Sequence, residues 1–212
     1  IGYYLASPFT LIVMLLPRTM IIESVMIMQL CKIGAAGLTF CIYAQRSKKI
    51  KPLQSLLFST AYAIMGYVVI QTIDPMWLDG AVFLPFIALG IEYLIDDGRK
   101  INYIIPLAIM FVANFYIGFM TAIFVAIYFF YYLFFGTERK FKNSSEYAGV
   151  VGRMALATVV ALMCSAIMLL PVYNALSLGK FDFSDPDYSF ATQFNPIELV
   201  PTLLPNQYYS VN

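Results

Sequence analysis

Long apolar stretches alternate with short polar breaks along most of this chain. The apolar blocks are Glu23–Ala44, Leu53–Ile73, Ala81–Ile95, Ile101–Phe135 and Val150–Leu176. A helix that crosses a bilayer needs about 20 mostly apolar residues. The blocks show no alternation of period 2, and backbone groups in lipid must be hydrogen-bonded within their own structure. The pattern therefore predicts membrane helices and not the strands of a barrel.

The fourth block, Ile101–Phe135, is too long for one membrane span. The polar or flexible residues Asn114 and Gly118 interrupt it near its middle. We therefore predict a short helix over Ile101–Ala113, a turn near Asn114 and a second helix that ends at Phe135. The expected fold is an all-α polytopic transmembrane bundle of about six helices, one of them too short to cross fully.

Composition agrees with a membrane protein and excludes several kinds of chemistry. The chain is 61% hydrophobic and 12% charged, whereas soluble domains carry about 25% charged residues. It contains no histidine, which excludes imidazole metal sites and catalysis by Ser-His-Asp or Cys-His groups within this chain. The three cysteines all fall in predicted helices, so no disulfide framework is expected.

Basic residues predict the orientation, because Lys and Arg collect on the cytoplasmic side. They fill three breaks, at residues 46–51, 99–100 and 139–142. These breaks are therefore expected inside, and the Asp74–Asp79 turn and the tail after Leu176 outside. We interpret the basic break at 46–51 as a topology signal, so no nucleic-acid partner is expected.

The two ends of the chain are expected to differ from its middle. We predict an interfacial segment along the outer face at residues 1–19, a transmembrane domain at 20–176 and an extracytoplasmic loop at 177–212. The chain begins without methionine and ends within an aromatic, proline-rich stretch. We therefore expect an internal piece of a longer bacterial membrane protein.

The turn Asp74-Pro75-Met76-Trp77-Leu78-Asp79 is the leading candidate site. It places two carboxylates and the only tryptophan of the chain between two apolar blocks. A carboxylate can accept a proton from a reacting hydroxyl, and an indole can stack against a sugar. The structural alternative is that Asp79 caps the helix that starts at Gly80 or Ala81, while Trp77 anchors in the interfacial aromatic belt.

Two cations lie near the same face. Lys32 is the one charge deep within a predicted span, where an ionisable group faces a polar cavity or a partner. It could hold a phosphate, or it could pair with a carboxylate or with carbonyl groups at a helix end. Arg18 could also contact substrate, although snorkelling to the interface explains it as well. Glu92, near the cytoplasmic end of its helix, is expected to be solvated.

Several motifs resemble the bacterial YfhO membrane protein family. They are Met76-Trp77-Leu78-Asp79, Leu84-Pro85, Gly90-Ile91-Glu92 and Asn114-Phe115-Tyr116-Ile117-Gly118. Leu30-Cys31-Lys32-Ile33-Gly34, Gly37-Leu38-Thr39-Phe40 and Phe194-Asn195-Pro196 fit the same pattern. The resemblance extends over nearly the whole chain. The Trp-Leu-Asp and Asn-Phe-Tyr-Ile-Gly motifs at this separation are its most specific part.

The resemblance implies a GT-C type glycosyltransferase that works at the outer face of the cytoplasmic membrane. Such an enzyme takes a sugar from a polyprenyl-phosphate donor, typically undecaprenyl phosphate. It passes the sugar to a cell-envelope polymer such as lipoteichoic or wall teichoic acid. The lipid tail needs an apolar lateral opening, which the aromatic helix Phe119–Phe135 could line. A divalent cation is a candidate cofactor, and the metal requirement stays open.

The resemblance also suggests roles for individual residues. Asp79 and then Asp74 are the candidate catalytic acids, and Trp77 is a candidate stacking wall. Asn114 and Tyr116 face the same side and are candidate hydrogen-bonding groups, and Lys32 and Arg18 are candidate substrate contacts. The principal catalytic acid of GT-C enzymes lies in the first outside loop, which is expected to precede Ile1.

Two other classes of function stay open. A broken helix and an intramembrane lysine are also features of transporters and lipid flippases. A structural partner in a membrane assembly is the third possibility. Transport favours internal repeats and a site near the midplane, whereas the acids of this chain cluster outside.

Overall fold

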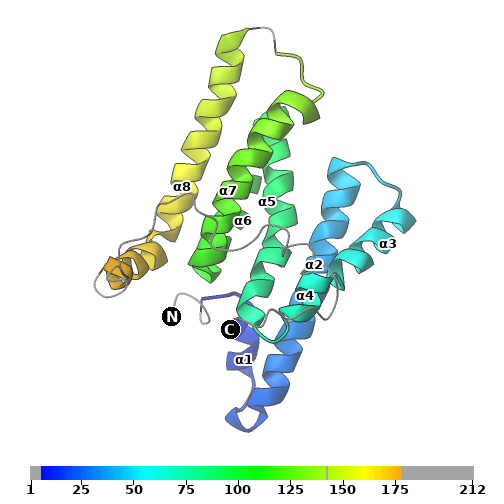
Figure 1. Cartoon of the computed structure of the whole chain (residues 1–212), viewed down its shortest axis with the longest axis vertical. Helices are drawn as coiled ribbons and strands as arrows, with labels where there is room; N and C mark the ends of the chain where they lie inside the picture. Colours follow the sequence, from blue (N-terminus) through cyan, green and yellow to red (C-terminus); the bar gives the residue numbers. More distant parts are fainter. Residues whose placement is uncertain (1–5, 142, 178–212) are drawn as a thin grey trace, which may run out of the picture. The chain divides into compact units, whose positions relative to one another are not determined.

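The computed structural model describes residues 6–141 and 143–177, and this part of the chain contains helices and no strand (Figure 1). The α-helices are α1 (Thr10–Leu15), α2 (Ile21–Ser47), α3 (Pro52–Ala63), α4 (Gly66–Ile70), α5 (Leu78–Asp96), α6 (Ile101–Ala113), α7 (Phe115–Tyr131) and α8 (Ser144–Ser177). Short 3₁₀ turns precede α2 and α5, and a π-helical turn, η3 (Tyr132–Gly136), continues α7.

The predicted all-α polytopic fold is confirmed. Within the described residues, five helical segments are long and apolar enough to cross a membrane, and α6 is a shorter apolar helix. The chain divides into two units, Ile1–Ala175 and Leu176–Asn212. The predicted extracytoplasmic loop at 177–212 lies outside the described residues, apart from the last residue of α8.

The predicted break near Asn114 is also confirmed. α6 ends at Ala113, and α7 begins at Phe115. Asn114 has an extended backbone, and its Oδ1 accepts hydrogen bonds from the backbone N–H groups of Tyr116 and Ile117. An asparagine in this position satisfies amides that the first turn of a helix leaves unpaired. The helix break therefore follows from local capping chemistry.

The second apolar block differs from its prediction as a single helix over Leu53–Ile73. α3 ends at Ala63, the backbone at Met65 is extended, and α4 contains only five residues. Gly66 directly follows the break, and glycine weakens a helix because it retains the most backbone freedom when unfolded. The chain after α4 continues as turns up to the start of α5.

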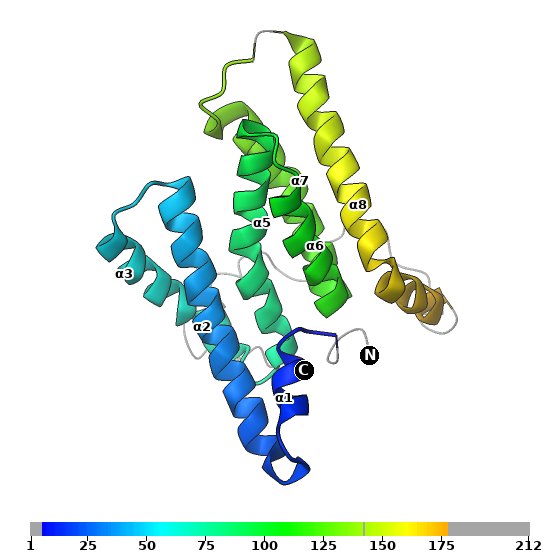
Figure 2. The same ribbon diagram turned by 180° about the vertical axis from the view of Figure 1, so that it is seen from behind.

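The core forms around α5, which packs against α2, α6 and α7. Both views show α5 between α2 on one side and the α6 and α7 pair on the other (Figure 2). Gly90 allows α5 to approach α6 closely, because a Cβ atom there would lie 2.5 Å from the Asn102 carbonyl oxygen. The helix that carries Asp79 and Glu92 is thus enclosed along most of its length.

α8 packs on the outer side of α6 through two polar contacts. The Tyr103 hydroxyl lies 2.8 Å from the Thr158 hydroxyl, and Ser165 donates a hydrogen bond to the Ala108 carbonyl. The end of α8 that contains Pro171 turns away from the axis of the rest (Figure 1). Proline removes one helical hydrogen bond and clashes with the preceding turn, which explains a bend there.

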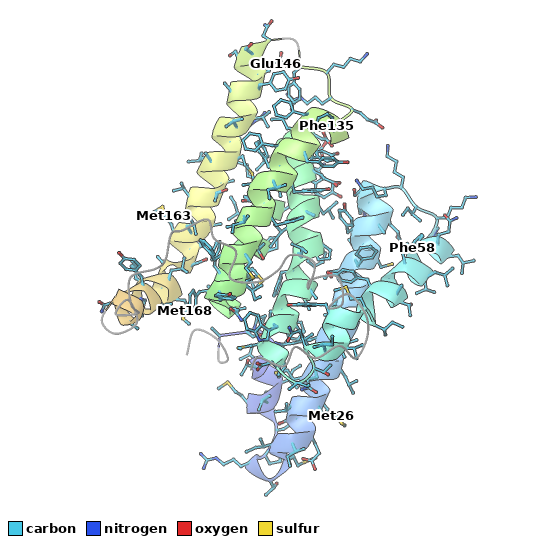
Figure 3. All side chains as sticks on the ribbon, viewed as in Figure 1. Met26, Phe58, Phe135, Glu146, Met163 and Met168 are labelled. Atoms are coloured by element: carbon cyan, nitrogen blue, oxygen red, sulfur yellow. The ribbon has the colours of Figure 1, made fainter. Side chains whose placement is uncertain are left out.

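Large apolar side chains cover much of the surface of α3, α7 and α8. Phe58 on α3, Phe135 on the turn η3 that continues α7, and Met163 on α8 are examples (Figure 3), and they are 57%, 81% and 71% exposed. Such a surface is unfavourable in water but is expected where helices face lipid tails. The exposed surface therefore agrees with the membrane assignment.

Candidate functional site

The turn between α4 and α5, residues 71–77, is fixed by side chains from several helices. Its carbonyl groups accept hydrogen bonds from Gln29 (to Thr72), Lys32 (to Pro75), Asn114 (to Met76) and Tyr67 (to Trp77), at 2.8, 2.9, 3.3 and 3.2 Å. Irregular backbone next to lipid needs such partners, because an unpaired carbonyl there costs several kcal/mol. The turn is therefore an ordered surface and not a loose connection.

A buried ion pair lies directly beneath this turn. Lys32 Nζ on α2 is 3.0 Å from Asp79 Oδ2 on α5, and the two side chains are 2% and 0% exposed. The Ser7 hydroxyl donates to Asp79 Oδ1 at 2.9 Å, and the Lys32 ammonium also lies 5.7 Å from the centroid of the Phe9 ring. Both carboxylate oxygens and two of the three ammonium donors thus have partners. Of the two open interpretations of Lys32, the structure shows the pair with a carboxylate.

Lys32 reaches Asp79 because α2 extends past the end of α5. Eleven residues of α2 precede Lys32, which corresponds to roughly 16 Å of helix. Lys32 therefore lies level with the first turn of α5, although it is deep within its own helix. A buried pair is tolerated only where hydrogen bonds satisfy its remaining donors and acceptors, as Pro75 and Ser7 do here.

The alternative role of Asp79 as a helix cap is wrong. α5 begins at Leu78, its N-cap is Trp77, and no side chain caps it. Asp79 lies in the first turn of the helix and points toward α2, where it meets Lys32. An acid in a first turn is also favoured by the helix dipole.

Trp77 and Tyr116 form an aromatic pair at the same end of the bundle. Their ring centroids are 5.4 Å apart, and the ring planes meet at 85°. Tyr116 is 41% exposed, and Trp77 is partly buried. Asn114 caps α7 and binds the carbonyl of Met76, so it holds Tyr116 against the turn. Two rings presented in this way can stack against the face of a sugar.

Asp74 and Arg18, the two remaining predicted site residues, differ in how close they lie to the Lys32–Asp79 pair. Asp74 is partly buried and directly precedes the 3₁₀ turn Pro75–Trp77, so it belongs to the site. Arg18 is exposed and precedes α2. It lies 14 residues before Lys32, roughly 20 Å along the helix direction. The structure does not bring Arg18 to Asp79.

An apolar cavity of about 330 Å³ opens beside the turn, between α3, α4, α5 and α7. Its lining residues are Tyr62, Met65, Tyr67, Gly80, Ala81, Leu84, Ile117, Met120, Thr121 and Phe124. Tyr67 lines the cavity and also donates to the Trp77 carbonyl, while Ile117 follows Tyr116. The cavity and the aromatic pair are thus adjacent. Met120, Thr121 and Phe124 of the segment Phe119–Phe135 supply one wall.

The described residues do not fit a divalent cation. No three of the acidic or cysteine side chains in the described ranges come together as a candidate metal site. Both oxygens of Asp79 are already occupied, by the Lys32 ammonium and the Ser7 hydroxyl. No step of the chemistry is therefore assigned to a metal here.

Three contributors to this site were not predicted. Gln29 lies one helical turn before Lys32, and residues three apart share a helix face, so this spacing was a usable signal. Ser7 and Tyr67 gave no such signal, because an isolated hydroxyl is equally common on a solvated face. Their roles depend on contacts between distant segments, since Ser7 precedes α1 and Tyr67 lies on α4.

The expectation that Glu92 is solvated is wrong. It is 4% exposed, and its Oε1 accepts hydrogen bonds from Ser47 at 2.8 Å and Tyr128 at 2.6 Å. Lys48 Nζ lies 3.5 Å from the same oxygen. Glu92 is buried because α2 and α7 enclose α5 on both sides as far as this end. A second lysine–carboxylate pair therefore joins α2 to α5.

Comparison with known proteins places the chain in a family. The family described as bacterial membrane protein YfhO matches residues 1–210. No protein of curated function and no solved structure matches the chain. Because the match covers nearly all of its 212 residues, the chain belongs to the YfhO family.

Proposed function

We propose that this YfhO family chain is part of a glycosyltransferase of the GT-C type in the bacterial cytoplasmic membrane. It would move a sugar from a polyprenyl-phosphate donor to a cell-envelope polymer, such as lipoteichoic or wall teichoic acid, at the outer face. The observation that carries the proposal is the apolar cavity beside the Trp77–Tyr116 pair. This arrangement offers a place for a lipid tail next to a wall for a sugar.

The size and lining of the cavity suit an isoprenoid chain. Its volume of about 330 Å³ falls at the lower end of ligand pockets, which span about 300–1,000 Å³. A cavity of this size holds one segment of a polyprenyl chain, while the rest of the chain stays in the bilayer. Met120 is 48% exposed at the edge of the cavity, so a lipid could enter sideways from the membrane.

The transfer itself requires one bond exchange and one proton transfer. The acceptor hydroxyl oxygen bonds to the anomeric carbon, the bond from that carbon to the phosphate oxygen breaks, and polyprenyl phosphate leaves. A carboxylate takes the hydroxyl proton. Asp74 lies on the partly exposed side of the turn and is the better placed of the two acids. Asp79 acts through Lys32, which holds the Pro75 carbonyl, and we assign it a positioning role.

A transfer assay with the full-length protein tests this function. Reconstituted protein is given labelled polyprenyl-phosphate sugar and teichoic acid acceptor, and labelled polymer is counted. Met120→Trp, which fills the edge of the cavity, is expected to reduce transfer at least tenfold. Ile123→Trp is the matched control, because Ile123 is on the same helix and 51% exposed but does not line the cavity.

Two results would overturn the proposal. Equal transfer by Met120→Trp and Ile123→Trp would show that the cavity has no role in sugar transfer. Movement of the labelled lipid across the bilayer with no transfer by the wild-type protein would instead support a flippase.

A further inference from the structure

A second cavity, also of about 330 Å³, lies at the other end of α2 and α5, close to the π-helical turn η3. Four of its lining side chains are cationic, Arg46, Lys48, Lys49 and Arg139, and three are acidic, Glu92, Asp96 and Glu138. Arg46 is 14 residues after Lys32 on α2, so this cavity lies roughly 20 Å along the helix from the Asp79 ion pair. It is separate from the proposed transfer site.

The cations of this cavity are only partly neutralised by protein groups. Lys48 pairs with Glu92, whereas no described carboxylate pairs with Arg46, Lys49 or Arg139. Arg139 donates one hydrogen bond to the Ile95 carbonyl. Asp96 accepts hydrogen bonds from the hydroxyl groups of Tyr132 and Thr137. Cationic groups therefore stay available to an anion.

Lys49 has a backbone conformation that is unusual for its residue type. Its φ is +52°, and in the described part of the chain it is the one residue other than glycine with a positive φ. The left-handed conformation after a helix end favours glycine, because a Cβ atom crowds the neighbouring carbonyl. A lysine here keeps its charge beside the cavity despite this steric cost.

A groove with both polar and apolar lining residues adjoins the cationic cavity. A third cavity, of about 250 Å³, lies between α2, α5 and α6 and shares Arg46 and Tyr93 with the cationic cavity. Its other lining residues are Ile42, Phe86, Leu89, Gly90 and Asn102. Arg46 thus lines both the charged cavity and the groove beside it. A free phosphate compound would use only the charged part, whereas a lipid would use both.

We propose that these two adjoining cavities bind one anionic phospholipid. Its phosphate contacts Arg46 and Lys49, and part of an acyl chain lies against Ile42, Phe86 and Leu89. Basic pockets between membrane helices on the cytoplasmic side are suited to anionic head groups, because phosphate accepts several charge-assisted hydrogen bonds. Bound lipid would join the ends of α2, α5 and α6, away from the outer face where sugar transfer is proposed.

A binding experiment in nanodiscs tests the site. Full-length protein is placed in phosphatidylcholine discs, and labelled phosphatidylglycerol is titrated in. The double variant Arg46→Gln with Lys49→Gln is expected to bind at least tenfold more weakly than wild type. The matched control is Lys51→Gln with Lys140→Gln, which removes the same charge from two exposed lysines that line neither cavity. It is expected to bind as wild type does.

Further measurements distinguish a bound lipid from a free phosphate compound and from a loss of folding. Glycerol phosphate at millimolar concentration is expected not to displace labelled phosphatidylglycerol, and displacement would assign the site to free phosphate compounds. Ile42→Trp, which fills the groove, is expected to weaken lipid binding. Arg46→Lys with Lys49→Arg is expected to restore it, which shows that loss in the glutamine variant is not misfolding. Equal binding by the glutamine variant and its control would overturn the proposal.

Discussion

The Lys32–Asp79 pair gives the sharpest prediction about stability. Lys32→Met leaves a buried carboxylate without its cation, and Asp79→Leu leaves a buried ammonium without its anion. Both side chains are almost fully buried, with the ammonium 3.0 Å from the carboxylate. Removing one partner of such a pair typically costs about 3–5 kcal/mol. Lys32→Met also leaves the Pro75 carbonyl without its donor, which adds about 1–3 kcal/mol.

The double variant, Lys32→Met with Asp79→Leu, distinguishes the interaction between the two charges from the packing of each side chain. With both charges removed, no buried charge lacks a partner. The main losses are then two hydrogen bonds, the one that Lys32 donates to the Pro75 carbonyl and the one that Ser7 donates to Asp79, at about 1–3 kcal/mol each. The double variant should therefore be more stable than either single variant. The expected coupling free energy lies at or above the upper end of the range for contacting residues, about 0.5–3 kcal/mol.

Reversible unfolding of the full-length protein in mixed detergent micelles, followed by circular dichroism, measures these differences. Lys48→Met is a useful comparison, because Lys48 is 50% exposed and lies 3.5 Å from Glu92. Glu92 is buried but keeps its hydrogen bonds from Ser47 and Tyr128, and a half-exposed lysine contributes less to a pair than a buried one does. Lys48→Met is therefore expected to lower the free energy of unfolding less than Lys32→Met does. If the double variant loses as much free energy of unfolding as the two single variants do together, the two residues are not coupled and the prediction is refuted. A cost for Lys32→Met no greater than that for Lys48→Met would refute it as well.

Three further predictions concern the turn, the helix packing and the topology. In the same unfolding assay, Asn114→Ala should lower the free energy of unfolding by about 1–3 kcal/mol, because it removes a helix cap and the donor to the partly buried Met76 carbonyl. An unchanged free energy of unfolding would contradict the assigned role. Gly90→Ala should lower the free energy of unfolding by about 1–3 kcal/mol, because its Cβ atom would overlap α6. The control Gly149→Ala places a Cβ atom that meets nothing within 4 Å, so it should be neutral or stabilising. Equal stabilities of the two variants would refute the close packing of α5 on α6. The orientation can be tested with single cysteines in a protein without its native cysteines. Ile73→Cys, beside the turn expected outside, should react with an impermeant maleimide in intact cells, whereas Lys140→Cys should react only after permeabilisation. The reverse result would show that the proposed orientation is inverted.

The helical fold could be predicted because it depends on local sequence. Block length and the absence of period-2 alternation identified the membrane helices. The turn at Asn114 was predictable because an amide interrupts a block too long for one span. The break between α3 and α4 was missed, since Met65 and Gly66 lie in an apolar run without a polar residue.

The site was only partly predictable because its contacts join distant parts of the chain. Lys32 and Asp79 were each identified as unusual, but they lie 47 residues apart. Whether they meet depends on how far α2 extends past α5, which no local pattern specifies. Glu92 was misjudged for the same reason, because its burial results from α2 and α7 and not from its place along α5. The two lysine–carboxylate pairs are thus products of helix packing.

The proposed sugar transfer depends most on whether the cavity beside the Trp77–Tyr116 pair holds the tail of a polyprenyl-phosphate sugar. Photocrosslinking with a labelled donor tests this directly, with a photoreactive residue at Met120 in one protein and at Ile123 in another. We expect the labelled lipid to be captured from Met120, at the edge of the cavity, and not from Ile123, on the outside of the same helix. Equal capture at the two positions would show ordinary contact with the bilayer and would contradict the proposed donor site.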